Sequence, residues 1–183
     1  MDRRQRKTRM AIFQAFIALL EERKFSQITV GQVIEKADVG RATFYAHFET
    51  KDDLLKALCG ELFDHIVEAA AGIETAHTHI FDCDATNSVF LHLLQHLEKN
   101  DNHILDLLSG GNDELFLGYF KAALKALAAN QLPMFAHRKA TALPEELWVD
   151  HIASSFIEAV HWWIGQGRAQ TPEQIMEYFF LLV

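Results

Sequence analysis

Four side chains that can hydrogen-bond to a nucleic acid fall within seven consecutive residues of the segment TVGQVIEKADVGRATFYAHF, residues 29–48. They are Arg41, Thr43, Tyr45 and His47. A guanidinium binds a phosphate or a guanine edge, and a threonine contacts a phosphate or a thymine methyl group. Tyrosine and histidine suit phosphate contacts. The residue types therefore favour contact with double-stranded DNA.

Two short helices, expected at 29–36 and 40–46, must present these side chains. The tight turn Ala37-Asp38-Val39-Gly40 joins them. The major groove is about 12 Å wide and admits a helix that is polar in front and apolar behind. The apolar backing is supplied by Val30, Val33, Ile34, Ala37, Val39, Phe44 and Phe48. Lys51 begins the next helix, where a cation and backbone N–H groups suit another phosphate.

The charge of the chain is divided unevenly between a head, residues 1–50, and a body, residues 51–183. The head has nine Lys and Arg against six Asp and Glu, a net charge of +3. The body has eight against nineteen, a net of −11, and the whole chain carries −8. A basic head on an acidic body steers one end of a protein toward a polyanion. Arg3, Arg4, Arg6 and Lys7 either add nonspecific attraction or form an ordinary solvated helix start.

The stretch ITVGQVIEKADVGRATFYAHFETKDDLLKAL resembles the DNA-binding domain of the TetR family of regulators. The shared features are an Ile/Val-rich second helix, Ala-x-Val-Gly at the turn, Thr-Phe-Tyr-x-His-Phe in the recognition helix, and Lys-x-x-Leu-Leu after it. The likeness spans residues 8 to 58 or so, and Gly40 replaces the serine cap of many members. By match to the motif, the resemblance implies DNA contacts by Thr29, Arg41, Ala42, Thr43, Tyr45, His47 and Lys51.

An all-α fold of about nine helices is expected, because apolar residues recur at helical spacing and strand signals are weak. The expected helices are 3–22, 29–36, 40–46, 51–76, 86–99, 101–109, 112–130, 145–166 and 171–182. Thr29 with Gln32 predicts a capping box, and Thr50 and Thr171 begin similar devices. We expect a three-helix helix-turn-helix domain at 1–50 and a helical ligand-binding and dimerisation domain at 51–183.

The body is rich in aromatic residues, some of which must face a pocket or another subunit. Family geometry and helical phase suggest a ligand pocket lined by His65, Leu91, His92, His96, Phe116 and Phe120. Aromatic residues are enriched at buried interface centres, and the family dimerises through its last two helices. These points suggest a dimer interface of Phe156, Val160, Trp163, Tyr178, Phe179 and Leu182, with ordinary monomer core as the alternative interpretation.

Histidine spacing leaves a metal-responsive body open. His92 and His96 are four residues apart and share a helix face, which suits one metal ion, and His77, His79 and Cys83 lie close in sequence. The alternatives are surface histidines, or pocket histidines that bind an organic ligand. Because no third ligand is visible, we assign no metal ligands and expect no cofactor.

Catalysis is not expected, and no catalytic residue is assigned. The sequence contains no Gly-x-Ser-x-Gly elbow, no phosphate-binding glycine loop and no HExxH motif. A helical adaptor that does not bind DNA is the other alternative, but it has no need for a polar face of the kind found at 41–51. With two cysteines and no run of about 20 apolar residues, we expect a cytoplasmic protein without membrane contact.

These observations, with the resemblance, predict a DNA-binding transcriptional regulator. The specific expectation is a ligand-responsive repressor that binds a palindromic operator as a homodimer. A small molecule of unknown identity is expected to release it from the DNA. A metal-responsive regulator of the same fold is the first alternative.

Overall fold

The computed structural model describes residues 3–70, 88–99, 104–109, 114–139 and 142–183. His77, His79 and Cys83 lie outside these residues, as do the ends of several expected helices. In the described part of the chain every regular element is helical, as predicted. No helix there is long and apolar enough to cross a membrane.

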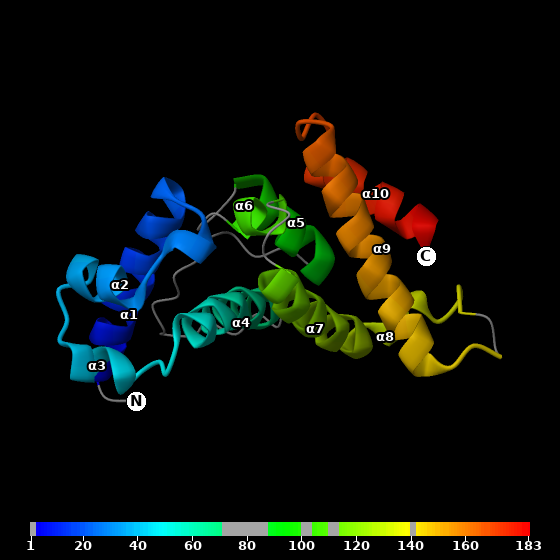
Figure 1. Ribbon diagram of the computed structural model, residues 1–183. Helices are drawn as coiled ribbons and strands as arrows, with labels where there is room; N and C mark the ends of the chain where they lie inside the picture. Colours follow the sequence, from blue (N-terminus) through cyan, green and yellow to red (C-terminus); the bar gives the residue numbers. More distant parts are fainter. Residues whose placement is uncertain (1–2, 71–87, 100–103, 110–113, 140–141) are drawn as a thin grey trace.

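The described residues form ten α-helices and one 3-10 turn (Figure 1). The helices are α1 (Arg3–Glu22), α2 (Val30–Lys36), α3 (Arg41–Tyr45), α4 (Lys51–Ala70), α5 (Val89–Lys99), α6 (Ile104–Ser109), α7 (Glu114–Asn130), α8 (Leu132–Phe135), α9 (Glu145–Gly165) and α10 (Pro172–Leu182), with the 3-10 turn at Phe25–Gln27. Each predicted helix has a counterpart. The short α8 was not predicted, because Pro133 was interpreted as a break, whereas proline is tolerated in the first turn of a helix.

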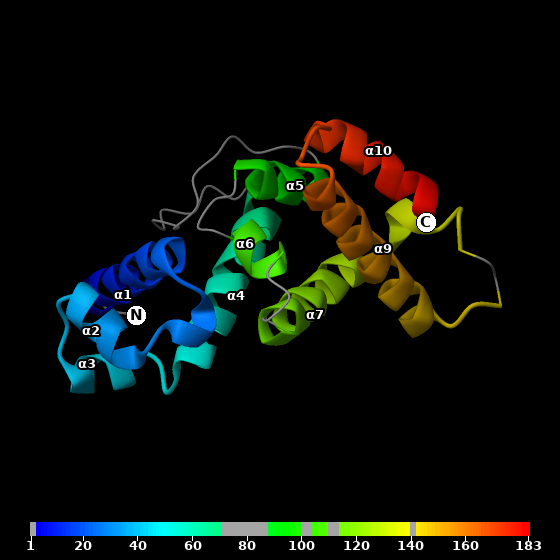
Figure 2. The same ribbon diagram turned by 45° about the horizontal axis from the view of Figure 1, so that its top comes forward.

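Helices α1, α2 and α3 gather at one end of the molecule (Figures 1 and 2). They share an apolar core that is rich in phenylalanine. Phe13 and Phe48 meet edge to face with ring centroids 5.5 Å apart, and Phe44 packs against Phe48 at 6.0 Å. Phe44 is fully buried, and Phe48 is 4% exposed. The predicted apolar backing of the second short helix is thereby confirmed, with Val33 also fully buried.

Side-chain caps fix where α2, α4 and α10 begin. The Thr29 N–H donates to Gln32 Oε1 at 2.9 Å, and the Gln32 N–H donates to Thr29 Oγ1 at 3.3 Å. The Asp53 N–H likewise donates to Thr50 Oγ1 at 3.0 Å. A third capping box joins Thr171 and Gln174. All three predicted caps are confirmed, and they satisfy N–H groups that the first helical turn leaves without an intrahelical partner.

Helix α4 extends from the α1–α3 group into the body, where it packs against α5 and α7 (Figure 1). Helix α7 in turn packs against α9, and α10 lies against both α5 and α9. Four phenylalanines hold the far end together: Phe90, Phe135, Phe156 and Phe179. The buried apolar side chains of head and body form one continuous cluster, so α4 is a shared structural element.

Candidate DNA-binding surface and buried histidine cluster

Helix α3 presents a polar face to solvent and an apolar face to the core. Arg41, Ala42 and Thr43 are exposed, and the Tyr45 side chain is 46% exposed, while Phe44 is fully buried. The short helix follows a turn in which Asp38 adopts φ 50°, a left-handed conformation that aspartate tolerates better than most residues. The turn and the buried Phe44 together hold the exposed side chains outward.

Two predicted contacts in this segment are fixed by aromatic packing. The Tyr45 ring meets Phe44 edge to face, with ring centroids 5.5 Å apart, and the residue remains 46% exposed. His47 is half-buried beside Phe48, with ring centroids 6.3 Å apart. Burial, and secondarily the positive charge of Arg9, lower the pKa of His47. The neutral imidazole favoured by that shift can still donate one hydrogen bond to a phosphate.

The Lys51 ammonium is held inside the head. Its Nζ donates to the backbone oxygens of Phe25 and Ile28, both at 3.1 Å, and lies 4.4 Å from the centroid of the Phe25 ring. A cation bonded in this way joins the start of α4 to the segment between α1 and α2. The sequence predicted that it would meet a phosphate, but in the protein without DNA its charge is used structurally.

Thr29 is exposed at the start of α2, and its side chain caps that helix. Its oxygen accepts from Gln32, and its own O–H proton is left to donate to a phosphate. The expected contact is therefore compatible with the cap. The four basic residues near the N-terminus, Arg3, Arg4, Arg6 and Lys7, are also exposed, on the first turns of α1.

Arg9 links α1, the segment after α3, and α4, although nothing in the sequence singled it out. Its Nη2 donates to Glu61 Oε1 at 3.3 Å, and its guanidinium lies 4.8 Å and 4.9 Å from the ring centroids of Phe13 and Phe48. A spacing of 52 residues separates the two charges, so no local pattern could have paired them.

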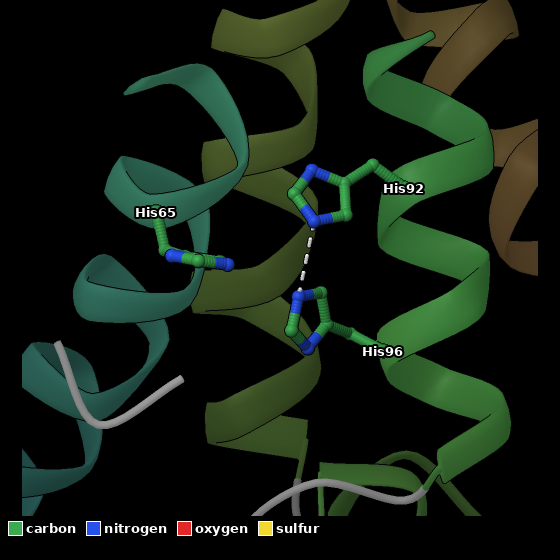
Figure 3. A group of neighbouring side chains, drawn as sticks. All are labelled: His65, His92 and His96. Carbon is green, nitrogen blue, oxygen red and sulfur yellow. Dashed lines mark hydrogen bonds between the residues drawn. The ribbon is translucent and has the colours of Figure 1, made fainter. Parts of the chain in front are cut away.

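Three buried histidines from two helices face one another in the body (Figure 3). His65 comes from α4, and His92 and His96 come from adjacent turns of α5. They are 8%, 0% and 2% exposed, and the ligating nitrogens all lie within 4.8 Å of one another. The Nε2 atoms of His92 and His96 are 3.2 Å apart. The helix face predicted for His92 and His96 is confirmed, and His65 is the third imidazole beside it.

The environment favours the neutral form of His92. Burial is the main reason that the pKa of His92 is lowered to about 4, and the neighbouring His96, His65 and Lys99 lower it further. Two imidazolium ions would repel each other at these separations. A neutral imidazole has one nitrogen with a lone pair, which is the form that binds metal ions.

The remaining residues of the expected pocket do not all share that site. Leu91 is half-buried. Phe116 and Phe120 are fully buried, and Phe120 packs edge to face on Phe63 at 5.2 Å. Phe63 and His65 are two positions apart on α4, about 200° around the helix. The expected set therefore divides into a histidine cluster facing α5 and an aromatic pair packed on another side of α4.

The residues expected at a dimer interface divide in a similar way. Phe156, Val160, Trp163 and Phe179 are at most 1% exposed within a single chain, so they are core residues and not a surface. Leu182 is 53% exposed and Tyr178 is 40% exposed. Three further exposed apolar side chains on α9 and α10 were not named from the sequence: Leu147, Trp162 and Leu181.

The fold and the exposed face of α3 are those of a helix-turn-helix transcriptional regulator, and comparison with known proteins agrees. Residues 12–58 match the model of the bacterial regulatory proteins of the tetR family, and residues 84–183 match a transcriptional regulator C-terminal region of the same group. The chain belongs to the TetR family, whose members are transcriptional regulators and not enzymes.

Individual relatives are consistent with this assignment. The structure of a TetR transcriptional regulator from Streptococcus agalactiae 2603V is 35% identical, with a TM-score of 0.73 over 100% of this chain and 96% of that one. FadR of Bacillus subtilis, solved with stearoyl-CoA, shares the fold at 18% identity and a TM-score of 0.57, over 95% and 97% of the chains. The HTH-type regulator YxbF of Bacillus subtilis (strain 168) is 25% identical over 98% of this chain, which spans only 45% of that relative's length.

Proposed function

We propose that this protein is a repressor that binds a palindromic operator as a homodimer and is released by a small-molecule effector. The observation that carries the proposal is the exposed polar face of α3 on a fully buried Phe44. In this proposal residues 1–50 bind DNA, and residues 51–183 bind the effector and the second subunit. Repression follows most simply from a dimer that occupies the operator and blocks polymerase.

Arg41, Thr43 and Tyr45 are the side chains we propose to contact DNA first, with Thr29, Ala42 and His47 beside them. All three side chains are exposed on a helix narrow enough for the major groove. Arg41 and Tyr45 share one face of that helix, whereas Thr43 lies about 200° around it from Arg41. For Lys51 we propose a supporting role, because its ammonium already bonds Phe25 and Ile28. The N-terminal basic residues add attraction that does not depend on sequence.

The dimer surface we propose is the exposed apolar strip along α9 and α10. Trp162 and Tyr178 meet edge to face across these helices, with ring centroids 5.8 Å apart, and each is at least 40% exposed. Leu181 is 83% exposed. Large exposed apolar side chains gathered in one place mark an interaction surface more often than a solvated one. Of the residues first expected there, Tyr178 and Leu182 are retained.

The body is where we propose that the effector binds. The FadR structure with stearoyl-CoA indicates that this fold can hold a small molecule, and the three buried histidines provide polar groups within the otherwise apolar core. An effector can act only through its difference in affinity between the DNA-binding and released states.

Selection of bound sequences from a random DNA pool at two salt concentrations tests the proposal. A palindrome whose affinity falls steeply as salt rises is the expected result. Arg41→Ala should weaken binding to that palindrome, and Lys139→Ala, which removes a partly exposed cation in the body, is the matched control. A folded, dimeric protein that enriches no sequence, with or without small molecules added, would contradict operator binding.

A further inference from the structure

We propose that His65, His92 and His96 form a binding site for a divalent transition-metal ion of the zinc type, and that this ion is the effector. The second half of this inference rests on the proposed repressor function, whereas the first half does not. Imidazole nitrogens suit zinc, copper and nickel, and a set of three histidines is an established zinc ligand set in proteins.

The spacing of the two α5 nitrogens fits a metal ion without rearrangement. The His92 and His96 Nε2 atoms are 3.2 Å apart. With metal–nitrogen bonds of about 2.0–2.1 Å, two atoms at that separation subtend roughly 100–106°, close to the tetrahedral angle. The two nitrogens now share a proton, which one donates and the other accepts. A metal ion between them would take the place of that proton, which moves to Nδ1 of the same ring through solvent, so that both neutral rings offer an Nε2 lone pair to the ion.

His65 completes the set from the neighbouring helix. Its ring centroid lies 5.3 Å from that of His92 and 4.9 Å from that of His96 (Figure 3). The ligating nitrogens are within 4.8 Å, and tetrahedral ligands of one ion are about 3.4 Å apart. Closing that gap needs a shift of no more than roughly 1.5 Å. Three protein ligands leave a fourth position for water or an anion, which suits a reversible site.

Burial makes these histidines unusual in this molecule. Among the described residues, the buried polar side chains are these three and no others. Polar side chains are seldom buried in an apolar core, and here three that can bind a metal ion are grouped on two helices. A metal ion would bind all three rings at once. The competing explanation is an organic effector that hydrogen-bonds to the three rings. Such an effector does not require the three ring nitrogens to converge on one point, as they do here.

Helix α4 connects this site to the DNA-binding surface. Lys51, at its first residue, bonds backbone oxygens of the head, and His65 lies fourteen residues later on the same helix, about 21 Å away. Drawing His65 toward α5 would therefore move the helix that carries the head. In a dimer, a small tilt of two such helices changes the spacing of the two recognition helices.

Cobalt(II) provides the direct test of the site, since tetrahedral Co²⁺ absorbs in the visible range and Zn²⁺ displaces it. The full chain, stripped of metal with a chelator, is titrated with Co²⁺ alone. One equivalent per protomer should produce this absorption, and Zn²⁺ should abolish it. Absence of such absorption, together with no calorimetric binding of Zn²⁺, would overturn the metal site.

Variants assign the signal to these residues and not to others. His92→Gln and His96→Gln should lose it, whereas His151→Gln, an exposed histidine on α9, should keep it. His96→Cys guards against simple misfolding, because a thiolate also binds Co²⁺ and adds a sulfur charge-transfer band. Co²⁺ absorption that is unchanged in both glutamine variants would place the metal elsewhere and overturn the assignment.

Operator binding then tests the effector role. With the selected DNA, saturating Zn²⁺ should lower the affinity of the wild-type protein roughly 5–150-fold, the usual range of coupling between two sites. His96→Gln should bind the operator with or without Zn²⁺. Binding that Zn²⁺ leaves unchanged or strengthens would overturn the effector role. If no operator exists, the proposed repressor fails, while the cobalt titration still decides the metal site.

Discussion

Arg9 on α1 donates to Glu61 on α4 at 3.3 Å, and Glu61 precedes His65 by one helical turn. The same guanidinium covers the Phe48 ring, three residues after α3 ends. The ion pair therefore connects the segment that follows the recognition helix α3 to the part of α4 that carries His65. Both partners are about one quarter exposed, so their contribution to stability is modest, but the contact spans the boundary between head and body.

Breaking this ion pair should reduce the coupling between Zn²⁺ binding and operator binding more than it reduces the stability of the fold. We expect Glu61→Gln to leave Zn²⁺ affinity within about threefold and to reduce the effect of Zn²⁺ on operator affinity, a change worth 0.5–2 kcal/mol for a residue along a coupling route. Isothermal titration and fluorescence anisotropy with operator DNA measure the two quantities. Glu158→Gln, on the exposed side of α9, is the control. An undiminished zinc effect in Glu61→Gln would show that the pair takes no part.

Tyr45→Ala should lower operator affinity and leave the fold intact, because the side chain is 46% exposed and its neighbour Phe44 fills the core. Arg41→Ala should act similarly and, if it removes a phosphate contact, should reduce the dependence of log affinity on log salt by about 0.9. Anisotropy titrations at several salt concentrations measure both effects. Full affinity in the two variants would move the recognition surface away from α3.

Lys51→Met should destabilise the protein. Its ammonium hydrogen-bonds two backbone oxygens, and losing bonds made by a charged donor costs about 1–3 kcal/mol in the free energy of unfolding. Denaturation by urea, monitored by circular dichroism, gives the value. The matched control is Lys56→Met, because Lys56 is an exposed lysine on the same helix, α4. A variant as stable as wild type that nevertheless loses DNA affinity would restore the phosphate role first expected for Lys51.

The sequence predicted helix positions well because caps and breaks are local signals. Thr29, Thr50 and Thr171 cap their helices as expected, and α1 spans Arg3–Glu22, the predicted 3–22. Relations between helices were harder to infer. His65 lies 27 residues before His92, and no periodicity brings the two rings together. The expectation that they share a pocket came from family geometry, and it did not separate them from Phe116 and Phe120.

Which side of α9 and α10 is exposed was harder still to predict, because both helices are apolar on more than one side. Trp162 and Trp163 are neighbours of the same type, yet the first is 44% exposed and the second is fully buried. The side of α9 that faces the core is decided by where α7 and α10 pack, which only the structure contains. The interface expected from the sequence therefore mixed residues from the buried side of these helices with residues from their exposed side.

Leu181→Glu should dissociate the dimer with little cost to the protomer. The side chain is 83% exposed in a single chain, so a charge there is solvated in the monomer but buried in the proposed interface. Sedimentation velocity measures the monomer fraction. Leu115→Glu, a 40% exposed leucine on α7, should stay dimeric. If Leu181→Glu is as dimeric as wild type, the subunits meet through another surface.

The Cys59 thiol should be inert while the protein is folded. Burial raises its pKa to about 12, so at pH 8 almost none of it is the reactive thiolate, whose population would grow only as pH rises toward that pKa. In a Cys83→Ser background, a disulfide reagent should label Cys59 only as fast as the core opens. Adding urea should bring the rate toward that of a free thiol. Rapid stoichiometric labelling of the native protein would mean that α4 does not hold Cys59 in the core, and the link we infer from the head through α4 to His65 would lose its rigid support.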